Sequence, residues 1–405
     1  MKNSSLLVLV LAVSALAAPA RAQSVPDTTS NADEARSQTT SAAGSHQSDR
    51  LVRLIDFAER QVEQYRSPRD GIGLRFGGIT SGSDLAVGPL WQTHALDGAV
   101  RLRASAAASM FRDYDVETGV AIPEVRTHRV SLSAGALKRH LAREHFYGLG
   151  MSSSATNKTT FELDRSEAHM EASLLAASWL TITGGGGWVD LSAADSNYSP
   201  ATSISTQFDR RSAPGLGLPA TFGVLSASAV LDWRDIPGNP RNGGRFQLSV
   251  DRHSDQSGHQ YSFSSATLDV EQHFSWWRRQ RVLSLRGRTA VAAPDTGNDV
   301  PFYLQPTLGG SRVLRGFATD RFRDRSLVWA QAEYGWDLWP FLGTVLFYEA
   351  GAVASEPAAL GFKDLKRDYG IGFRIGSART IAVRTDVAFG SGEGTRIAMR
   401  FSHAF

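Results

Sequence analysis

The chain has 405 residues, of which 42% are hydrophobic and none is cysteine, and its formal net charge is +3. No disulfide can therefore hold the fold together, and the nearly neutral charge gives no reason to expect a nucleic-acid partner. The chain lacks any apolar run of the roughly 18 residues that a membrane-spanning helix needs, which excludes a helical membrane protein. A mean hydropathy of -0.22 is still compatible with a transmembrane β-barrel, because lipid-facing and lumen-facing residues alternate along its strands.

Residues 1–22 have the features of a secretory signal peptide. Lys2 precedes an apolar run from Leu6 to Ala18, and Ala20-Arg-Ala22 provides a cleavage site of the A-x-A kind. The chain is therefore predicted to be exported. Residues 23–50 are rich in Ser, Thr, Gln and Ala and cannot bury enough apolar surface to offset chain entropy, which predicts a disordered periplasmic leader.

Residues 51–68 are predicted to form one amphipathic helix. Apolar residues recur at helical spacing from Leu51 to Tyr65 with charges between them, until Ser67-Pro68 ends the pattern. The sequence leaves two placements open. The helix either rests on the membrane or the barrel rim, or plugs the lumen.

Residues 69–405 are predicted to form an all-β domain, a transmembrane antiparallel β-barrel of about 16 strands. The hydrophobic period changes from 3.6 to 2, and Gly, Ser, Asn and Asp clusters divide the chain into segments of about ten residues. Charges such as Arg384 and Asp386 recur on one face of many strands, which requires an aqueous lumen. The candidate strands are 71–80, 85–93, 97–109, 111–122, 127–140, 160–177, 180–192, 222–234, 244–253, 261–275, 280–293, 326–338, 343–354, 368–377, 380–389 and 395–405.

The connections between these strands alternate in length. Those near 94–96 and 339–342 are short, whereas 193–221 and 294–325 are long. Short periplasmic turns and longer external loops are typical of outer-membrane barrels. Tryptophans such as Trp336 fall beside the short turns, where an aromatic girdle is expected.

Three motifs lie within this domain. The first is Leu308-Gly-Gly-Ser-Arg-Val-Leu-Arg-Gly-Phe317 in the long 294–325 connection, with Arg315, Gly316 and Phe317 at its end. The second is the turn from Asp232 to Gly244, which contains Arg234, Asp235 and Pro240. The third is the terminal strand, whose Phe401, His403 and Phe405 share one face and end the chain.

Together the motifs resemble the outer-membrane assembly and translocation superfamily, which includes BamA-type and TamA-type insertases, two-partner secretion pores and bacterial surface antigens. The resemblance implies that the Arg-Gly-Phe loop folds back into the barrel, where acidic residues at the positions of Glu333 and Glu349 hold Arg315. Both glutamates also have inward parity on their strands. Glu349 departs from the family pattern, which usually has Asp. The plainer alternatives are an ordinary Arg-Gly loop turn and an ordinary Asx and proline turn at Asp232.

The resemblance implies a cell outer-membrane protein that assists insertion or translocation of protein or lipid through a weak seam between its first and last strands, with no chemical step. It implies outer-membrane lipid and polypeptide clients or outer-membrane proteins as partners. No catalytic residue, metal site or cofactor is expected, since no G-x-S-x-G, H-E-x-x-H or P-loop motif occurs. The interval from Gln23 to Pro68 is too short for the family's periplasmic POTRA domains, so a member without them is expected. The alternative function is a porin or surface antigen barrel that passes small solutes.

Overall fold

The computed structural model describes residues 70–80, 85–125, 129–197, 202–377, 379–390 and 392–401. The predicted signal peptide, leader and amphipathic helix lie outside the described residues, as do His403 and Phe405. None of the helices in the described part of the chain is long and apolar enough to cross a membrane.

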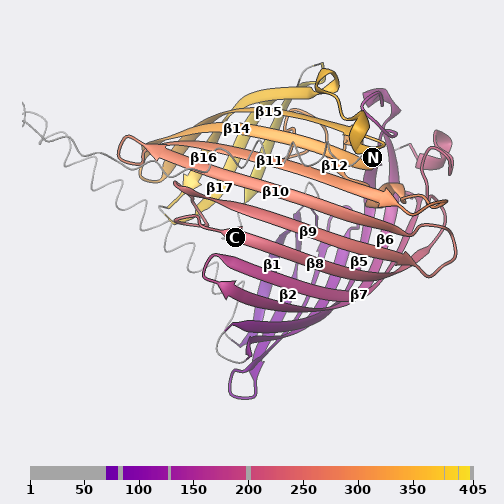
Figure 1. Cartoon of the computed structure of the whole chain (residues 1–405), viewed down its shortest axis with the longest axis horizontal. Coiled ribbons are helices and arrows are strands. Elements are labelled where there is room, and N and C mark those ends of the chain that lie inside the picture. Colours follow the sequence, from indigo (N-terminus) through magenta and orange to yellow (C-terminus); the bar gives the residue numbers. More distant parts are fainter. Residues whose placement is uncertain are drawn as a thin grey trace, which may run out of the picture. The chain divides into compact units, whose positions relative to one another are not determined.

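The described chain forms one sixteen-stranded sheet in which each strand pairs antiparallel with the next strand of the sheet (Figure 1). This confirms the predicted fold, a transmembrane antiparallel β-barrel. No pairing joins β1 to β18 among the described residues, so each keeps one free edge there. The strands are β1 (Gly71–Gly78), β2 (Leu85–Ala95), β3 (Val100–Ser109), β4 (Tyr114–Val125), β5 (Val130–Phe146), β6 (Thr159–Ala177), β7 (Leu180–Asp195), β8 (Ala220–Asp232), β9 (Gly243–Asp255), β10 (Phe263–Trp276), β11 (Arg281–Pro294), β14 (Ser326–Trp339), β15 (Leu342–Ala354), β16 (Lys366–Gly376), β17 (Ile381–Gly390) and β18 (Gly394–Phe401).

Strand β16 shows why this sheet belongs in a membrane. Its outward residues Tyr369 and Phe373 are apolar and 60% and 42% exposed, whereas the inward Asp368 and Arg374 are buried. A soluble protein has the opposite arrangement, with apolar side chains inside. The exposed apolar face suits lipid, and the inward face places charges in the lumen.

The longest connection, between β11 and β14, contains structure that the sequence analysis did not predict. A two-stranded hairpin forms from β12 (Thr307–Leu308) and β13 (Phe322–Arg323). Both strands are only two residues long, too short for a period of 2 to be recognised. The remaining short elements are the 3-10 helices η1 (Ala155–Asn157), η2 (Ile204–Thr206), η3 (Phe302–Leu304), η4 (Pro357–Ala359) and η5 (Phe362–Asp364).

The largest boundary error concerns strand β5. The predicted segment 127–140 stops six residues before the last residue of the observed strand, Phe146. The residues from Leu141 to Phe146 lay outside the predicted segment. In the structure these residues continue the strand, and the pairing with β6 shifts register between Leu141 and Glu144. Such a bulge changes the alternation of faces, which hides the strand from a pattern of strict period 2.

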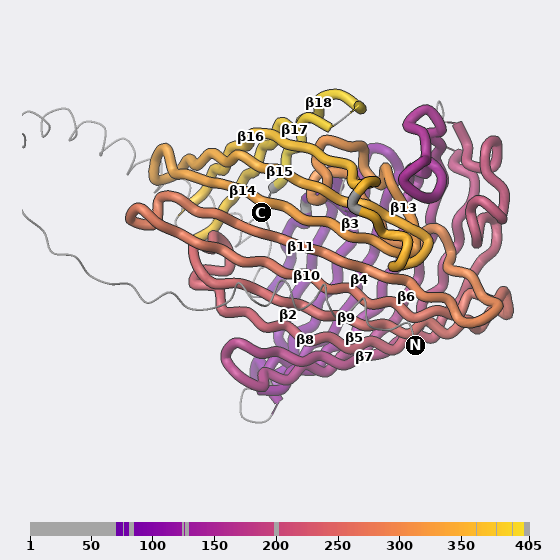
Figure 2. Tube along the Cα trace, turned by 45° about the horizontal axis from the view of Figure 1, so that its top comes forward, coloured from indigo at the N-terminus to yellow at the C-terminus, as the bar shows by residue number. Residues whose placement is uncertain are grey.

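The long connections gather at one end of the strands and the tight turns at the other (Figure 2). At the long-loop end, Phe302 of the β11–β14 loop packs in an aromatic cluster with the strand residues Phe146, Phe161, Phe222 and Phe263. This cluster therefore joins the loop to strands β5, β6, β8 and β10.

The β5–β6 loop (147–158) crosses to other parts of the barrel. The amide of Gly150 donates a 2.8 Å hydrogen bond to the carbonyl of Arg323 in the β11–β14 loop. The amide of Val353 on β15 donates to the sulfur of Met151 at 3.1 Å. Since β5 and β15 are far apart in the sheet order, these contacts hold the loops inside the barrel mouth.

Candidate functional site in the barrel lumen

The apex of the β11–β14 loop is a tight turn from Leu314 to Phe317. The amide of Phe317 donates to the carbonyl of Leu314 at 3.0 Å, and Leu314 itself has a positive φ of 47°. Leu314 and Phe317 are buried in an apolar cluster with Leu308 and Trp329. With both ends of the turn fixed in this way, its two central residues, Arg315 and Gly316, are directed at the strands.

Arg315 is bound by carboxylates from three strands. Its backbone amide and its Nε donate to the two oxygens of Glu349 at 2.8 and 3.0 Å. Its Nη1 donates to Asp386 at 2.9 Å and to Glu333 at 3.4 Å. The guanidinium carbon lies 3.5 Å from the centre of the Phe347 ring. The arginine side chain is only 1% exposed, and a charge so deeply buried is stable only when it is paired in this way.

Gly316 is held by backbone contacts. Its amide donates a 2.6 Å hydrogen bond to the Oδ2 of Asp368. A Cβ at this position would lie 2.5 Å from the backbone nitrogen of Gly390 and 2.8 Å from the Cβ of Asp368. Only a glycine allows the loop to approach the wall this closely.

We call the four carboxylates that face the loop tip, Glu333, Glu349, Asp368 and Asp386, the acidic receptor. They come from β14, β15, β16 and β17, four neighbouring strands of the sheet. Glu349 and Asp368 are directly paired across β15 and β16. Two ionised carboxylates in such positions repel each other, and donors placed between them reduce that repulsion. The amides of Arg315 and Gly316, with the arginine side chain, supply those donors.

Small residues on β16 make room for this arrangement. A Cβ at Gly370 would lie 2.4 Å from the Phe347 ring, and one at Gly372 would lie 2.1 Å from a carboxylate oxygen of Asp386. The glycines therefore allow Phe347 to lie beneath Arg315 and Asp386 to reach it.

Arg374 connects the acidic receptor to a further layer. It donates to Asp386 at 2.6 Å and to Glu333 at 3.0 Å. Arg400 of β18 also reaches Asp386, at 3.4 Å. Glu333 is closer to Arg374 than to Arg315, so its main role in the structure is to orient Arg374.

The structure thus brings together Arg315, Glu333 and Glu349, as predicted from the sequence, and it adds two partners that the sequence did not indicate. Asp386 is nearer to Arg315 than Glu333 is, and Asp368 holds Gly316. Asp386 had shown inward parity in the sequence, but nothing in a strand pattern indicates which loop residue an inward carboxylate meets.

The second predicted motif forms the turn between β8 and β9 at the short-turn end of the barrel. Arg234 binds both oxygens of Asp232, with Nε at 2.9 Å and Nη2 at 2.6 Å. One oxygen of Asp235 accepts the amides of Arg241 and Asn242 at 3.0 and 3.2 Å. The Asx and proline turn chemistry expected from the sequence therefore operates here.

This turn also contacts three other hairpins at the same end. Arg241 binds Asp337 of β14 through two hydrogen bonds of 2.8 and 3.1 Å. Asn239 donates to the carbonyl of Ser377 at 3.1 Å, and Arg279 pairs with Asp235. The β8–β9 turn therefore ties together the β10–β11, β14–β15 and β16–β17 turns.

The remaining predicted site residues have varied positions. A Cβ on Gly244 would lie 2.6 Å from the side chain of Gln272. The absence of a side chain at Gly244 therefore allows β9 and β10 to pack closely. Pro240 lines a cavity at the short-turn end. Phe401 ends the described part of β18, and the rest of the terminal motif lies outside it.

The chemistry that this arrangement supports is binding. Within the described ranges, no group of three or more His, Asp or Glu side chains is placed to hold a metal ion. The acidic receptor and the arginines pair with each other and so hold a loop in place.

A barrel with these features, apolar outside, charged inside and with its longest external loop bound in the lumen, defines an outer-membrane β-barrel of the assembly and translocation class. The chain matches the Omp85 superfamily domain over residues 98–404 and belongs to that superfamily.

The chain was also compared in fold with solved structures. The chain is similar to BamA from Haemophilus ducreyi lacking POTRA domains 1-3, with a TM-score of 0.63 at 14% identity, covering 82% of this chain and 71% of that one. CdiB from Acinetobacter baumannii matches at a TM-score of 0.48 and 12% identity, over 81% of this chain and 58% of that chain. CdiB from Escherichia coli matches at 0.49 and 12%, over 83% and 61%. The chain thus spans less than two thirds of either CdiB. No curated protein sequence matches it.

Proposed function

We propose that this protein assists the insertion or translocation of polypeptide at the outer membrane, with no chemical step. The observation that carries the proposal is the burial of Arg315 in the acidic receptor. In a member of the Omp85 superfamily, this contact fixes an external loop inside the lumen and braces β14 to β17. The last of these strands, β17, pairs with β18, one of the two strands with a free edge among the described residues.

A free edge is the part of the barrel that supports insertion. An unpaired strand presents a row of N–H and C=O groups that an incoming strand can join. Ile72 on β1 and Ile397 on β18 are 81% and 76% exposed, so both edges also carry apolar side chains suited to lipid. The braced strands provide a rigid wall against which the edge strand opens and recloses.

The packing of the long-loop end favours this function over a porin. The β5–β6 and β11–β14 loops bond to each other, and Phe302 is packed among the strand aromatics. A pore for small solutes needs a permanent water-filled path, whereas these loops are bonded to each other at the long-loop end of the barrel.

The proposal is tested by reconstituting the full chain in liposomes and adding an unfolded small outer-membrane barrel as client. We expect the protein to raise the fraction of client that shows heat-modifiable gel migration several-fold over empty liposomes, and Arg315→Ala to remove most of that gain. Arg288→Ala is the matched control, since Arg288 is also ion-paired but partly exposed. A wild-type protein that gives no gain, together with a steady conductance blocked by added solute, would establish the porin alternative.

A further inference from the structure

Three arginines form a row across the lumen face of the last strands. Arg374 on β16 is directly paired with Arg384 on β17, which is directly paired with Arg400 on β18. Like charges opposite each other on neighbouring strands are destabilising unless something of the opposite sign lies between them. The row therefore requires negative partners.

The outer two arginines have such partners. Arg374 binds Glu333 and Asp386, and Arg400 binds Asp386. Arg384, in the middle, has no hydrogen bond or ion pair with any residue in the part of the chain that the structure describes. The neighbouring Glu333 and Asp386 are shared between Arg315 and Arg374, and neither pairs with Arg384.

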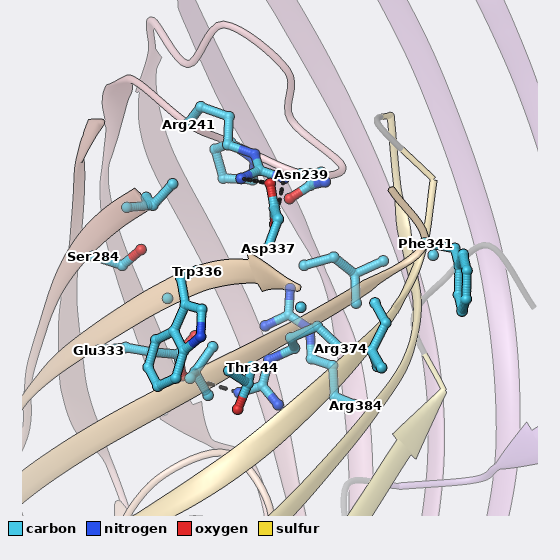
Figure 3. A pocket seen from close by; sticks show the side chains of 18 of the residues that line it. Asn239, Arg241, Ser284, Glu333, Trp336, Asp337, Phe341, Thr344, Arg374 and Arg384 are labelled. Atoms are coloured by element: carbon cyan, nitrogen blue, oxygen red, sulfur yellow. Dashed lines mark hydrogen bonds and ion pairs between the residues drawn. The ribbon is translucent and has the colours of Figure 1, made fainter. Parts of the chain in front are cut away.

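Arg384 borders a cavity of about 90 Å³ at the short-turn end of the lumen, and Figure 3 shows it there beside Arg374 and Glu333. The charged residues of the lining are Arg241, Arg286, Arg374, Arg384, Glu333 and Asp337. Arg241 pairs with Asp337, Arg286 pairs with Glu271 at 3.3 Å, and Arg374 pairs with Glu333 and Asp386. Among the described residues, this leaves Arg384 as the arginine of the lining that has no carboxylate partner. A water needs roughly 10 to 15 Å³ of such space, so the cavity has room for a compact ion.

We propose that Arg286, Arg374 and Arg384 form a binding site for a phosphate group in this cavity. A guanidinium donates two parallel hydrogen bonds to phosphate or carboxylate. Three guanidinium groups around one cavity suit phosphate better, since it offers more oxygens and a second negative charge. The group comes either from a free phosphate ester or from a lipid headgroup. The site does not depend on whether the barrel moves polypeptide.

Binding of inorganic phosphate to the full-length protein in detergent is measured by titration calorimetry, against chloride at equal ionic strength. We expect Arg384→Gln to weaken phosphate binding about tenfold or more, because one charge-assisted hydrogen-bonding group is lost. Arg288→Gln should leave binding within about twofold, since Arg288 lies outside the cavity lining and pairs with Asp269. Arg384→Lys keeps the charge and should bind with intermediate affinity; it serves as the second variant should Arg384→Gln not fold.

If phosphate binds no more tightly than chloride, the site is ruled out. It is also ruled out if Arg384→Gln and Arg288→Gln lose the same phosphate affinity, because the loss would then reflect only the overall electrostatic potential of the lumen. The two sources of phosphate are separated in nanodiscs. Phosphate binding that is unchanged by phosphatidic acid in the disc identifies a soluble ligand, whereas binding that phosphatidic acid blocks identifies the lipid headgroup. Both of these results support the site.

Discussion

The backbones of Gly316 and Gly390 meet so closely that neither residue has room for a side chain. A Cβ on Gly316 would lie 2.5 Å from the nitrogen of Gly390, and a Cβ on Gly390 would lie 2.3 Å from the carbonyl oxygen of Gly316. One glycine belongs to the loop apex and the other ends β17. The loop therefore docks through backbone contact as well as through the charge of Arg315.

We expect Gly316→Ala to push the loop apex away from β17 and to cost about 1 to 3 kcal/mol, the usual penalty for overpacking a tight site. Faster protease cleavage within residues 309–325 would report the displacement. Gly184→Ala is the control, because a Cβ there meets nothing within 4 Å. Equal protease resistance of Gly316→Ala and the wild type would show that the apex is not docked on Gly390.

Arg315 and Glu349 are expected to act as one coupled pair. Breaking a buried pair by removing one partner typically costs about 3 to 5 kcal/mol, because the other charge is left without compensation. Arg315→Ala and Glu349→Ala should therefore each lower stability, and the double variant should lose clearly less than the sum. Heat-modifiable gel migration across a temperature series measures all three. Strictly additive losses would place Arg315 in solvent.

The β8–β9 turn is expected to loosen in acid. Burial of Asp235 opposes its ionisation, but the amides of Arg241, Asn242 and Ile236 together with the charge of Arg279 outweigh it and hold the pKa of Asp235 below its ordinary value. A lowered pKa in the folded state means that the carboxylate stabilises the turn above about pH 4, its unfolded pKa, and that this contribution is lost as the pH falls.

Limited proteolysis of the turn between pH 3 and pH 7 follows this loss. Asp235→Asn is the matched variant, since an amide oxygen can still accept the backbone amides but carries no charge. We expect the wild type to become protease-sensitive at the acid end and the variant to change much less with pH. If the protease sensitivity of the wild type and of Asp235→Asn changes with pH in the same way, groups other than Asp235 cause the loosening in acid.

Residues 51–68 remain a prediction from sequence, with two placements open. If the helix plugs the lumen, deletion of Leu51 to Arg66 should raise bilayer conductance without lowering the yield of folded barrel. Deletion of residues 24–39 in the leader is the control for shortening the chain. Unchanged conductance at full yield would place the helix outside the pore.

The strand pattern could be predicted from the sequence because a barrel wall imposes a period of 2 on every strand. All sixteen predicted segments overlap observed strands, and the largest error, at the end of β5, falls where that period fails, at the bulge between Leu141 and Glu144. The hairpin of β12 and β13 was missed because two residues carry no period.

The site was harder to predict than the wall. Parity indicated that Glu333 and Glu349 face inward, but the choice of partner depends on how far the β11–β14 loop descends and which strands lie beneath its apex. Those distances come from packing of Leu314 and Phe317 and from the glycines at 370 and 372, none of which a strand pattern contains. Asp368 was missed for that reason, since it binds a backbone amide.

The direct pairing of Glu349 with Asp368 has a consequence for the order of assembly. Both carboxylates accept hydrogen bonds from the loop apex, Glu349 from Arg315 and Asp368 from Gly316. Before the loop arrives, β15 and β16 would face each other in this register with two buried acids opposed. We expect β15 and β16 to reach their final register only after the β11–β14 loop has entered the lumen. A newly made barrel would then complete this part of its wall last, and the loop inside the lumen would set the register.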